Sequence, residues 1–226
     1  MKLAVLFSGG KDSTLALHRA VEKETVSCLI SIVSMNKSSF MFHTPNIDLT
    51  GLQAEALELP LIRRLTEGKP EEELEDLKKA IGEAAETFGI EGVVTGAIES
   101  VYQAERIQRI CHEEDLWCIN PLWKRNQQDL LEEILERNFQ VIISGVFAYP
   151  LDESWLGKTL DKGLVERLLR LGREYGISPS GEGGEIETTV LDAPLFRRRI
   201  DVLEAGVEME KTSGTYVIKK TGLADK

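Results

Sequence analysis

The sequence predicts an α/β protein with a parallel, Rossmann-like sheet in its first half and a smaller α+β domain in its second half. Up to about residue 124, short apolar segments alternate with amphipathic segments of helical length, which is the pattern of βαβ units. A turn with two glycines directly follows the first apolar segment. Later segments alternate between apolar and polar residues, as antiparallel strands do. We therefore predict two domains, residues 1–124 and residues 125–226.

Strands and helices are predicted in turn along the first half. Residues 2–7 are apolar at nearly every position, which is typical of a strand buried on both faces. The helix at residues 70–88 has the clearest boundaries, because proline stands at its start, acidic residues fill its first turns and Gly89 follows it. The other predicted strands are residues 26–33, 61–64, 93–96 and 116–120, and the other predicted helices are residues 12–22, 48–57 and 100–112.

The second half begins with an amphipathic helix that ends the first domain or bridges to the second. After it the βαβ pattern gives way to a strand, a helix, a glycine-rich loop and two alternating segments, which predict antiparallel pairing. These predicted elements are the helices at residues 126–138 and 161–175, the loop at residues 177–187, and the strands at residues 140–147, 198–210 and 215–220.

The composition is typical of a soluble globular protein. Apolar residues make up 42% of the chain and charged residues 29%, and no apolar run is long enough to cross a bilayer. The apolar N-terminus is too short for a signal peptide, because polar residues interrupt it from Ser8 onwards. The cysteines Cys28, Cys111 and Cys118 do not form a disulfide pattern. We therefore place the protein in the cytoplasm.

The net charge bears on the partners. At −11, it argues against a large nucleic-acid-binding surface, because phosphate contacts need Lys and Arg. Homo-oligomerisation stays open.

The most informative motif is Ser-Gly-Gly-Lys-Asp-Ser at residues 8–13, between a predicted strand and a predicted helix. Its glycines permit dihedral angles that a Cβ would forbid and let backbone amides approach an anion. The following helix adds unpaired N–H groups and the positive end of its dipole. Hydroxyls of Ser8 and Ser13 and the charge of Lys11 complete a cradle for phosphate. The spacing is not that of a Walker A motif, and the alternative is a glycine turn with an N-cap.

This string resembles the PP-loop of the N-type ATP pyrophosphatases, whose members adenylate a substrate and release pyrophosphate. The resemblance implies ATP and Mg²⁺ as cofactors, with the loop holding the leaving pyrophosphate and its magnesium. Preorganised donors would stabilise the charge that develops on this leaving group. The metal ligands remain open. The residues assigned to the nucleotide in this way are Ser8, Gly9, Gly10, Lys11, Asp12 and Ser13.

Three further segments narrow the family. They are residues 41–46, a stretch from Thr95 to residue 123, and Gly-Glu-Gly-Gly-Glu-Ile-Glu-Thr at residues 181–188 with the Leu-Asp and Pro-Leu-Phe that follow. In this order they resemble the diphthine–ammonia ligase (diphthamide synthase) family, and the resemblance covers almost the whole chain. Ile186 departs from the family pattern, in which an aromatic residue is common, but an apolar residue preserves packing there.

The resemblance implies a C–N ligase that acts on diphthine, a modified histidine of translation elongation factor 2. ATP would adenylate the diphthine carboxylate, and ammonia would then displace AMP. Position 2 is Lys rather than a Cys that would serve as a glutaminase nucleophile, and the chain is too short for a separate glutaminase domain. Free ammonium is therefore the expected nitrogen donor.

Two groups of further site residues are expected from these segments. His43, Thr95, Gly96 and Ala97 follow predicted strands, at the edge where α/β sheets bind ligands, and are expected to border the nucleotide. The candidates for the acceptor and ammonium are Tyr102, Gln103, Arg106, Glu182, Gly183, Gly184, Glu185, Glu187 and Thr188. The predicted catalytic residues are Lys11, Asp12, Glu182 and Glu185.

The carboxylates of residues 181–188 suit two cations, the trimethylammonium of diphthine and ammonium itself. Glu182 or Glu185 is expected to accept a proton as ammonia attacks, although a merely solvated acidic loop is the alternative. Trp123 and Trp155 are further candidates for cation–π contact with trimethylammonium, although core packing is the commoner role of a tryptophan.

Two other functions stay open. A PP-loop tRNA-modifying enzyme would transfer sulfur or an amine after adenylation, but Cys111 and Cys118 lack the CxxC spacing and basic neighbours that activate a thiol. A non-enzymatic nucleotide-binding sensor of the same architecture would not need the acidic segment.

Overall fold

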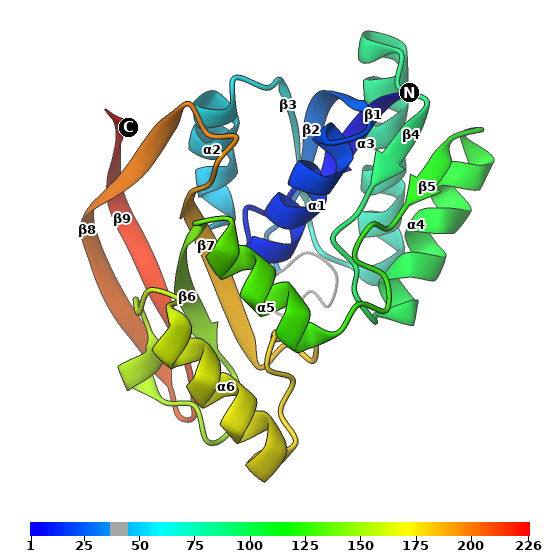
Figure 1. Cartoon of the computed structure of the whole chain (residues 1–226). Helices are drawn as coiled ribbons and strands as arrows, with labels where there is room; N and C mark the ends of the chain where they lie inside the picture. The colour runs from blue at the N-terminus through cyan, green and yellow to red at the C-terminus, as the bar shows by residue number, and fades with distance from the viewer. Residues whose placement is uncertain (37–44) are drawn as a thin grey trace.

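A five-stranded sheet forms the first layer of the protein, whose computed structural model describes residues 1–36 and 45–226. All neighbouring strands are parallel, in the order β3-β2-β1-β4-β5 (Figure 1). The winding therefore reverses between β1 and β4, and the carboxyl edge of the sheet at such a switch point is where α/β proteins commonly bind ligands. The strands are β1 (Lys2–Leu6), β2 (Thr25–Ser34), β3 (Leu61–Thr66), β4 (Gly92–Val94) and β5 (Trp117–Ile119).

Helices bury this sheet on both faces. Successive residues of β1 point to opposite sides, so that Ala4 joins the core under α3 and α4 while Leu3 and Val5 join the core that contains α1. No helix among the described residues is long and apolar enough to cross a membrane. The helices of this half are α1 (Lys11–Val21), η1 (Ile47–Leu49), α2 (Thr50–Leu57), α3 (Pro70–Phe88) and α4 (Val101–Glu113).

A four-stranded antiparallel sheet forms the second layer, in the order β7-β6-β9-β8. The predicted combination of a parallel α/β sheet with a smaller α+β part is therefore confirmed. Figure 1 shows α5 lying between the two sheets. The elements of this half are α5 (Gln127–Glu136), β6 (Gln140–Val146), η2 (Glu153–Trp155), α6 (Lys162–Tyr175), β7 (Ile186–Asp192), β8 (Arg198–Glu210) and β9 (Ser213–Asp225).

Strand β7 is the main element that the sequence analysis missed. The predicted loop at residues 177–187 ends in the structure where β7 begins, at Ile186. Thr188, Thr189 and Val190 are all buried, so the strand lacks the apolar and polar alternation that predicts a strand with one exposed face. The run of β-branched residues was the available signal. The other predicted elements are confirmed to within a few residues, and β9 extends beyond the prediction because its end pairs with the start of β8.

One apolar core joins the two halves of the chain. Leu15 of α1 belongs to the same buried cluster as Leu130 of α5 and Val141 of β6. The parallel sheet ends at Ile119, and the antiparallel sheet begins at Gln140. The domain boundary that we predict near residue 125 falls between these strands and stays a prediction, because the packing continues across it.

A buried carboxylate strengthens the contact between the halves. Glu133 of α5 is 8% exposed and lies 2.5 Å from Arg125, 2.6 Å from Arg19 and 2.7 Å from Arg137. Burial tends to raise the pKa of this carboxyl, but hydrogen bonds from the three arginines outweigh burial and hold the pKa below its ordinary value. The cluster therefore ties α1 to α5 through charge-assisted hydrogen bonds.

His18 of α1 is a second buried polar group in this contact. Its Nδ1 lies 2.8 Å from the Thr14 carbonyl oxygen, and its Nε2 lies 3.2 Å from the N–H of Leu195. Because that N–H can only donate, Nε2 accepts and Nδ1 carries the proton. Burial lowers the pKa of His18 to about 4, against the raising effect of the Thr14 carbonyl. The histidine is therefore neutral and hydrogen-bonded on both sides.

The stability of the fold should rise with pH between about 4 and 6.5, because His18 takes up a proton in the unfolded chain but not in the folded one in this range. The contribution is fully present above the unfolded pKa and is lost as the pH falls through the folded pKa. Its full size is about 3 kcal/mol. Denaturant titrations of the wild type and of His18→Gln across this range measure it. Equal pH slopes for both proteins would contradict the assignment.

Candidate functional site

The glycine-rich turn that follows β1 lies at the switch point of the parallel sheet. Gly9 has a φ of +76°, which glycine adopts without the strain that a side chain would bring. Gly10 is the N-cap residue of α1 and offers no capping side chain. The positive end of the helix dipole therefore faces the turn, and the cap residue has no side chain that would neutralise it. Helix N-termini that bind anions have this arrangement.

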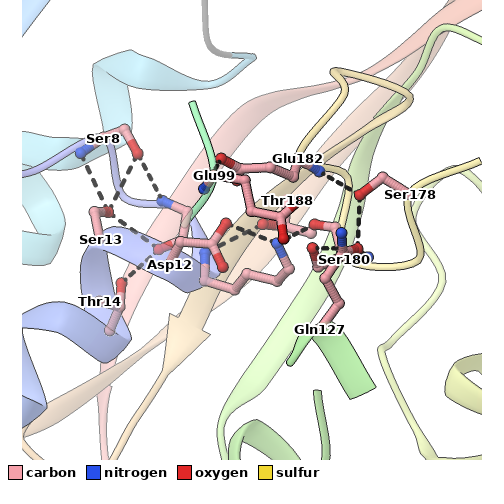
Figure 2. Close-up of polar contacts among 12 residues, drawn as sticks. Ser8, Asp12, Ser13, Thr14, Glu99, Gln127, Ser178, Ser180, Glu182 and Thr188 are labelled. Atoms are coloured by element: carbon pink, nitrogen blue, oxygen red, sulfur yellow. Dashed lines mark hydrogen bonds and ion pairs between the residues drawn. The ribbon is translucent and has the colours of Figure 1, made fainter. Parts of the chain in front are cut away.

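Hydroxyl groups brace this turn from within (Figure 2). Ser13 Oγ accepts from the N–H of Ser8 at 3.3 Å and donates to the Gly10 carbonyl at 3.1 Å. Ser8 Oγ lies 3.2 Å from Ser13 Oγ and accepts from the N–H of Gly10 at 3.4 Å. These hydrogen bonds fix the shape of the turn, and they occupy the N–H groups of Ser8 and Gly10.

Lys11 is buried at the start of α1, with 3% of its surface exposed. Its Nζ donates to Asp12 Oδ2 at 2.7 Å and to the Ser180 carbonyl at 2.5 Å. An ammonium group has three N–H donors, so these two contacts leave one for a phosphate oxygen. Asp12 Oδ1 is buried and has no hydrogen-bond partner among the described residues.

Strand β7 and helix α2 hold the turn from behind. The Gly9 carbonyl accepts from Gln53 Nε2 at 2.9 Å and from the N–H of Val190 at 3.0 Å. The N–H of Lys11 donates to Thr188 Oγ1 at 3.1 Å. Gln53 also donates to the Val190 carbonyl at 2.8 Å. Sequence reasoning missed Gln53, whose only signal was a polar residue in a mostly apolar helix.

The segment after β4 reaches the same turn. A Cβ on Gly96 would lie 2.8 Å from the backbone nitrogen of Ser13, so the two loops touch at the backbone. Thr95 is 2% exposed; its hydroxyl lies 2.5 Å from Asn120 Oδ1 and accepts from the N–H of Ala97 at 3.2 Å. The structure therefore brings the predicted residues 95–97 to the predicted phosphate loop.

The loop at residues 178–185, here called the acidic loop, carries two of the predicted catalytic carboxylates. Glu182 Oε1 accepts from the N–H of Glu99 at 2.7 Å (Figure 2). It also accepts from the N–H of Ser100 at 2.9 Å, just before α4 begins. Glu185 Oε1 accepts from the N–H of Ser178 at 2.8 Å, and its Oε2 is buried without a partner among the described residues. Both carboxylates thus fix backbone, in addition to any role toward a ligand.

Glu187 is the carboxylate of this region whose pKa is clearly shifted. It lies at the start of β7, beside Thr188 and opposite Gly145 of β6. Burial raises the pKa of Glu187 to about 7; the charge of Lys11 opposes the shift and the charge of Asp12 adds to it. The group therefore changes its charge near neutral pH, next to the two charged residues that begin α1.

Other predicted residues lie elsewhere or outside the described chain. The guanidinium of Arg106 lies 3.4 Å from the ring centroid of Tyr102 and donates to the Tyr102 carbonyl at 3.1 Å. Gln103 lies in the same turn, where its N–H donates to Ser100 Oγ, and the roles of all three toward an acceptor stay predictions. Trp155 is 3% exposed in the core, where Arg167 covers its ring.

His43 lies outside the described residues, so its expected place beside the nucleotide stays a prediction. Gly183 and Gly184 are exposed within the acidic loop. Gly184 has a φ of +81°, which only glycine adopts readily, so the predicted acceptor role of this pair rests on loop shape rather than on side-chain contacts.

Fold and site together define an α/β nucleotide-binding protein whose phosphate loop is of the PP-loop type. Residues 1–117 match the family described as "Diphthamide synthase N-terminal domain", and residues 126–223 match the "Diphthamide synthase C-terminal domain". The chain belongs to the diphthamide synthase family, as the motifs predicted.

Relatives of known name agree with this assignment. The chain is 38% identical to "Diphthine--ammonia ligase" of Rattus norvegicus, over 89% of this chain and 83% of that protein. It is 34% identical to "Diphthine--ammonia ligase" of Schizosaccharomyces pombe, over 100% of this chain and 40% of that longer protein.

A solved structure titled as a predicted subunit of tRNA methyltransferase from Methanocaldococcus jannaschii aligns with a TM-score of 0.45 at 19% identity, covering 86% of this chain and 98% of that one.

Gly96→Ala should weaken nucleotide binding at least tenfold and destabilise the fold by about 1–3 kcal/mol. The new Cβ would meet the backbone of Asp12 and Ser13, which cannot move without shifting the phosphate loop. Gly51→Ala is the matched control, because a Cβ there meets nothing within 4 Å and a glycine inside a helix costs about 0.5–1 kcal/mol relative to alanine. Calorimetric ATP titration and denaturant unfolding measure both effects; equal behaviour of the two variants would contradict the close approach.

Glu187→Gln should stabilise the protein above pH 7 and change little at pH 4.5. The folded pKa of Glu187 is raised, so its contribution to stability is fully present below the unfolded pKa and is lost as the pH rises through about 7. We expect a gain on the order of 2 kcal/mol at alkaline pH. Unfolding titrations of both proteins at acid and alkaline pH measure it, and a variant that is less stable than wild type at alkaline pH would refute it.

Proposed function

We propose that this chain is a diphthine–ammonia ligase, which uses ATP to convert the carboxylate of diphthine on translation elongation factor 2 into its amide. Membership of the diphthamide synthase family carries the proposal. The preorganised phosphate loop beside the acidic loop supports it, because the reaction needs a nucleotide and a cationic acceptor at one place. This pairing favours the ligase over the nucleotide sensor.

The chemistry has two steps. A diphthine carboxylate oxygen attacks the α-phosphorus of ATP, the bond to the β-phosphate breaks, and pyrophosphate leaves with the electron pair. The nitrogen of ammonia then attacks the acyl carbon, the bond to AMP breaks, and a base takes the surplus proton. Donors of the phosphate loop stabilise the charge on the leaving pyrophosphate. The buried Lys11 acts there most strongly, because burial strengthens its electrostatic effect.

The phosphate loop also suits magnesium. A nucleotide-bound Mg²⁺ is held through phosphate oxygens and one or two carboxylates, and it neutralises phosphate charge. Asp12 fits this role, because its buried Oδ1 has no partner among the described residues. The ion would give that oxygen the partner it lacks.

The acidic loop and the start of β7 suit the cations of the reaction. Glu185 has a carboxylate oxygen without a partner among the described residues, and Glu187 titrates near neutrality beside Lys11. Carboxylates so placed attract ammonium and trimethylammonium and accept a proton. We infer that the protein works in the cytoplasm, where translation factors act.

Two of the three cysteines do not suit sulfur transfer. Cys111 is buried, and a hydrogen bond with Cys118 together with burial raises the pKa of its thiol far above the ordinary value. Burial also raises the pKa of Cys28, to about 11. A sulfur carrier needs an accessible thiolate, so these observations weigh against Cys28 and Cys111 as carriers. Cys118 is half-buried, and its hydrogen bond with Cys111 lowers the pKa of its thiol, which leaves it as the single candidate.

Incubation with ATP, Mg²⁺, ammonium and diphthine-bearing elongation factor should yield AMP, pyrophosphate and the amide. Lys11→Ala should lower the rate at least a hundredfold, which corresponds to about 2–4 kcal/mol of transition-state stabilisation. Lys79→Ala, on the surface of α3, is the matched control and should act like wild type. Chromatography of nucleotides and intact mass of the acceptor are the measurements. ADP and phosphate as main products would exclude the proposal.

A further inference from the structure

A single oxygen of α5 gathers both serines of the acidic loop. Gln127 Oε1 accepts from Ser178 Oγ at 2.6 Å, from Ser180 Oγ at 2.9 Å and from the N–H of Ser180 at 3.1 Å (Figure 2). A backbone N–H can only donate, so the atom that faces it is the amide oxygen and not the amide nitrogen. The three contacts therefore require a side chain with an acceptor at this point.

From these two serines the network extends to both sides of the site. On the nucleotide side, the carbonyl of Ser180 accepts from Lys11 Nζ at 2.5 Å. On the acceptor side, Ser178 Oγ accepts from the N–H of Glu182 at 3.0 Å, whose carboxylate binds the backbone before α4. One oxygen of Gln127 thus sets the position of groups that serve both substrates.

Gln127 stands on a well-packed helix, whereas the acidic loop that it holds contains flexible glycines. Gln127 is the first residue of α5, whose Leu130 and Leu131 are fully buried in the shared core. The acidic loop contains Gly181 and Gly184 at φ of +78° and +81°, and glycines lose the most conformational freedom on ordering. The Gln127 oxygen, fixed at the start of a packed helix, therefore restricts the conformations of a loop whose own sequence does not restrict them.

We infer that Gln127 is a positioning residue that holds the acidic loop closed beside the phosphate loop, so that ammonia rather than water reaches the acyl-adenylate. The inference rests on the proposed function. An activated acyl group needs protection from water, which closed loops commonly provide. Displacement of catalytic groups by about 1 Å is enough to lower rates severely. Gln127 itself touches no reacting atom.

The test compares Gln127→Met with wild type. Methionine keeps the length of the side chain and the helix propensity but removes the oxygen. The variant should form several AMP per amide, where wild type forms about one, and the KM for the acceptor should rise roughly tenfold. Hydrogen exchange of residues 178–185 should accelerate.

Two further variants on α5 distinguish loss of the positioning contact from a nonspecific effect of substitution on the helix. Gln127→Glu keeps an acceptor oxygen at the same place and should restore coupling close to one AMP per amide. Gln128→Met makes the same change one residue along, where the side chain is exposed and donates to Glu132 of its own helix. This control should match wild type in coupling and in exchange.

The outcomes are distinct. Normal coupling and normal exchange in Gln127→Met would overturn the inference. If that variant does not fold, Ser178→Ala decides, because it removes only the branch to Glu182 and should still raise the KM for the acceptor; an unchanged KM would overturn the inference. A wild type that makes no amide refutes the proposed function instead. In that case, faster exchange in Gln127→Met but not in Gln128→Met would still support the positioning role.

Discussion

The carbonyl of Gly9 is the point on which the site depends, because two distant segments meet there. Gln53 of α2 and the N–H of Val190 of β7 both donate to it, and the neighbouring Thr188 accepts from the N–H of Lys11. The phosphate loop of one sheet is therefore held by a strand of the other. Since the acidic loop leads directly into β7, docking of this strand also positions the acidic loop.

This arrangement explains how a lysine is buried at low cost. An unpaired charge in a protein interior costs several kcal/mol, on the order of the whole stability of a domain. Lys11 avoids that cost through Asp12 and the Ser180 carbonyl. Glu187 is less well compensated, as its raised pKa shows. The site therefore holds charge at some expense of stability, which is common where function needs a particular electrostatic field.

The predicted catalytic carboxylates of the acidic loop hydrogen-bond to backbone groups in this structure. Glu182 binds the backbone before α4, and Glu185 binds Ser178 of its own loop. Such contacts give a glycine-rich loop a defined shape. Glu187, which the sequence suggested as a binding residue for the acceptor or ammonium, is the carboxylate of this segment whose pKa responds to the charges of Lys11 and Asp12. Roles within the acidic segment thus depend on contacts that spacing along the chain does not reveal.

The sequence alone determined the α/β class, most elements, the glycine-rich turn after β1 and the family, because periodicity, glycine placement and short motifs are local properties. It did not predict β7, because burial on both faces removes alternation, and it did not single out Gln53 or Gln127. A glutamine gains a role only from the atoms that face it, which come here from segments far away in the chain. Only tertiary packing decided that one oxygen of α5 holds the acidic loop and that one strand of the second sheet holds the glycine-rich turn.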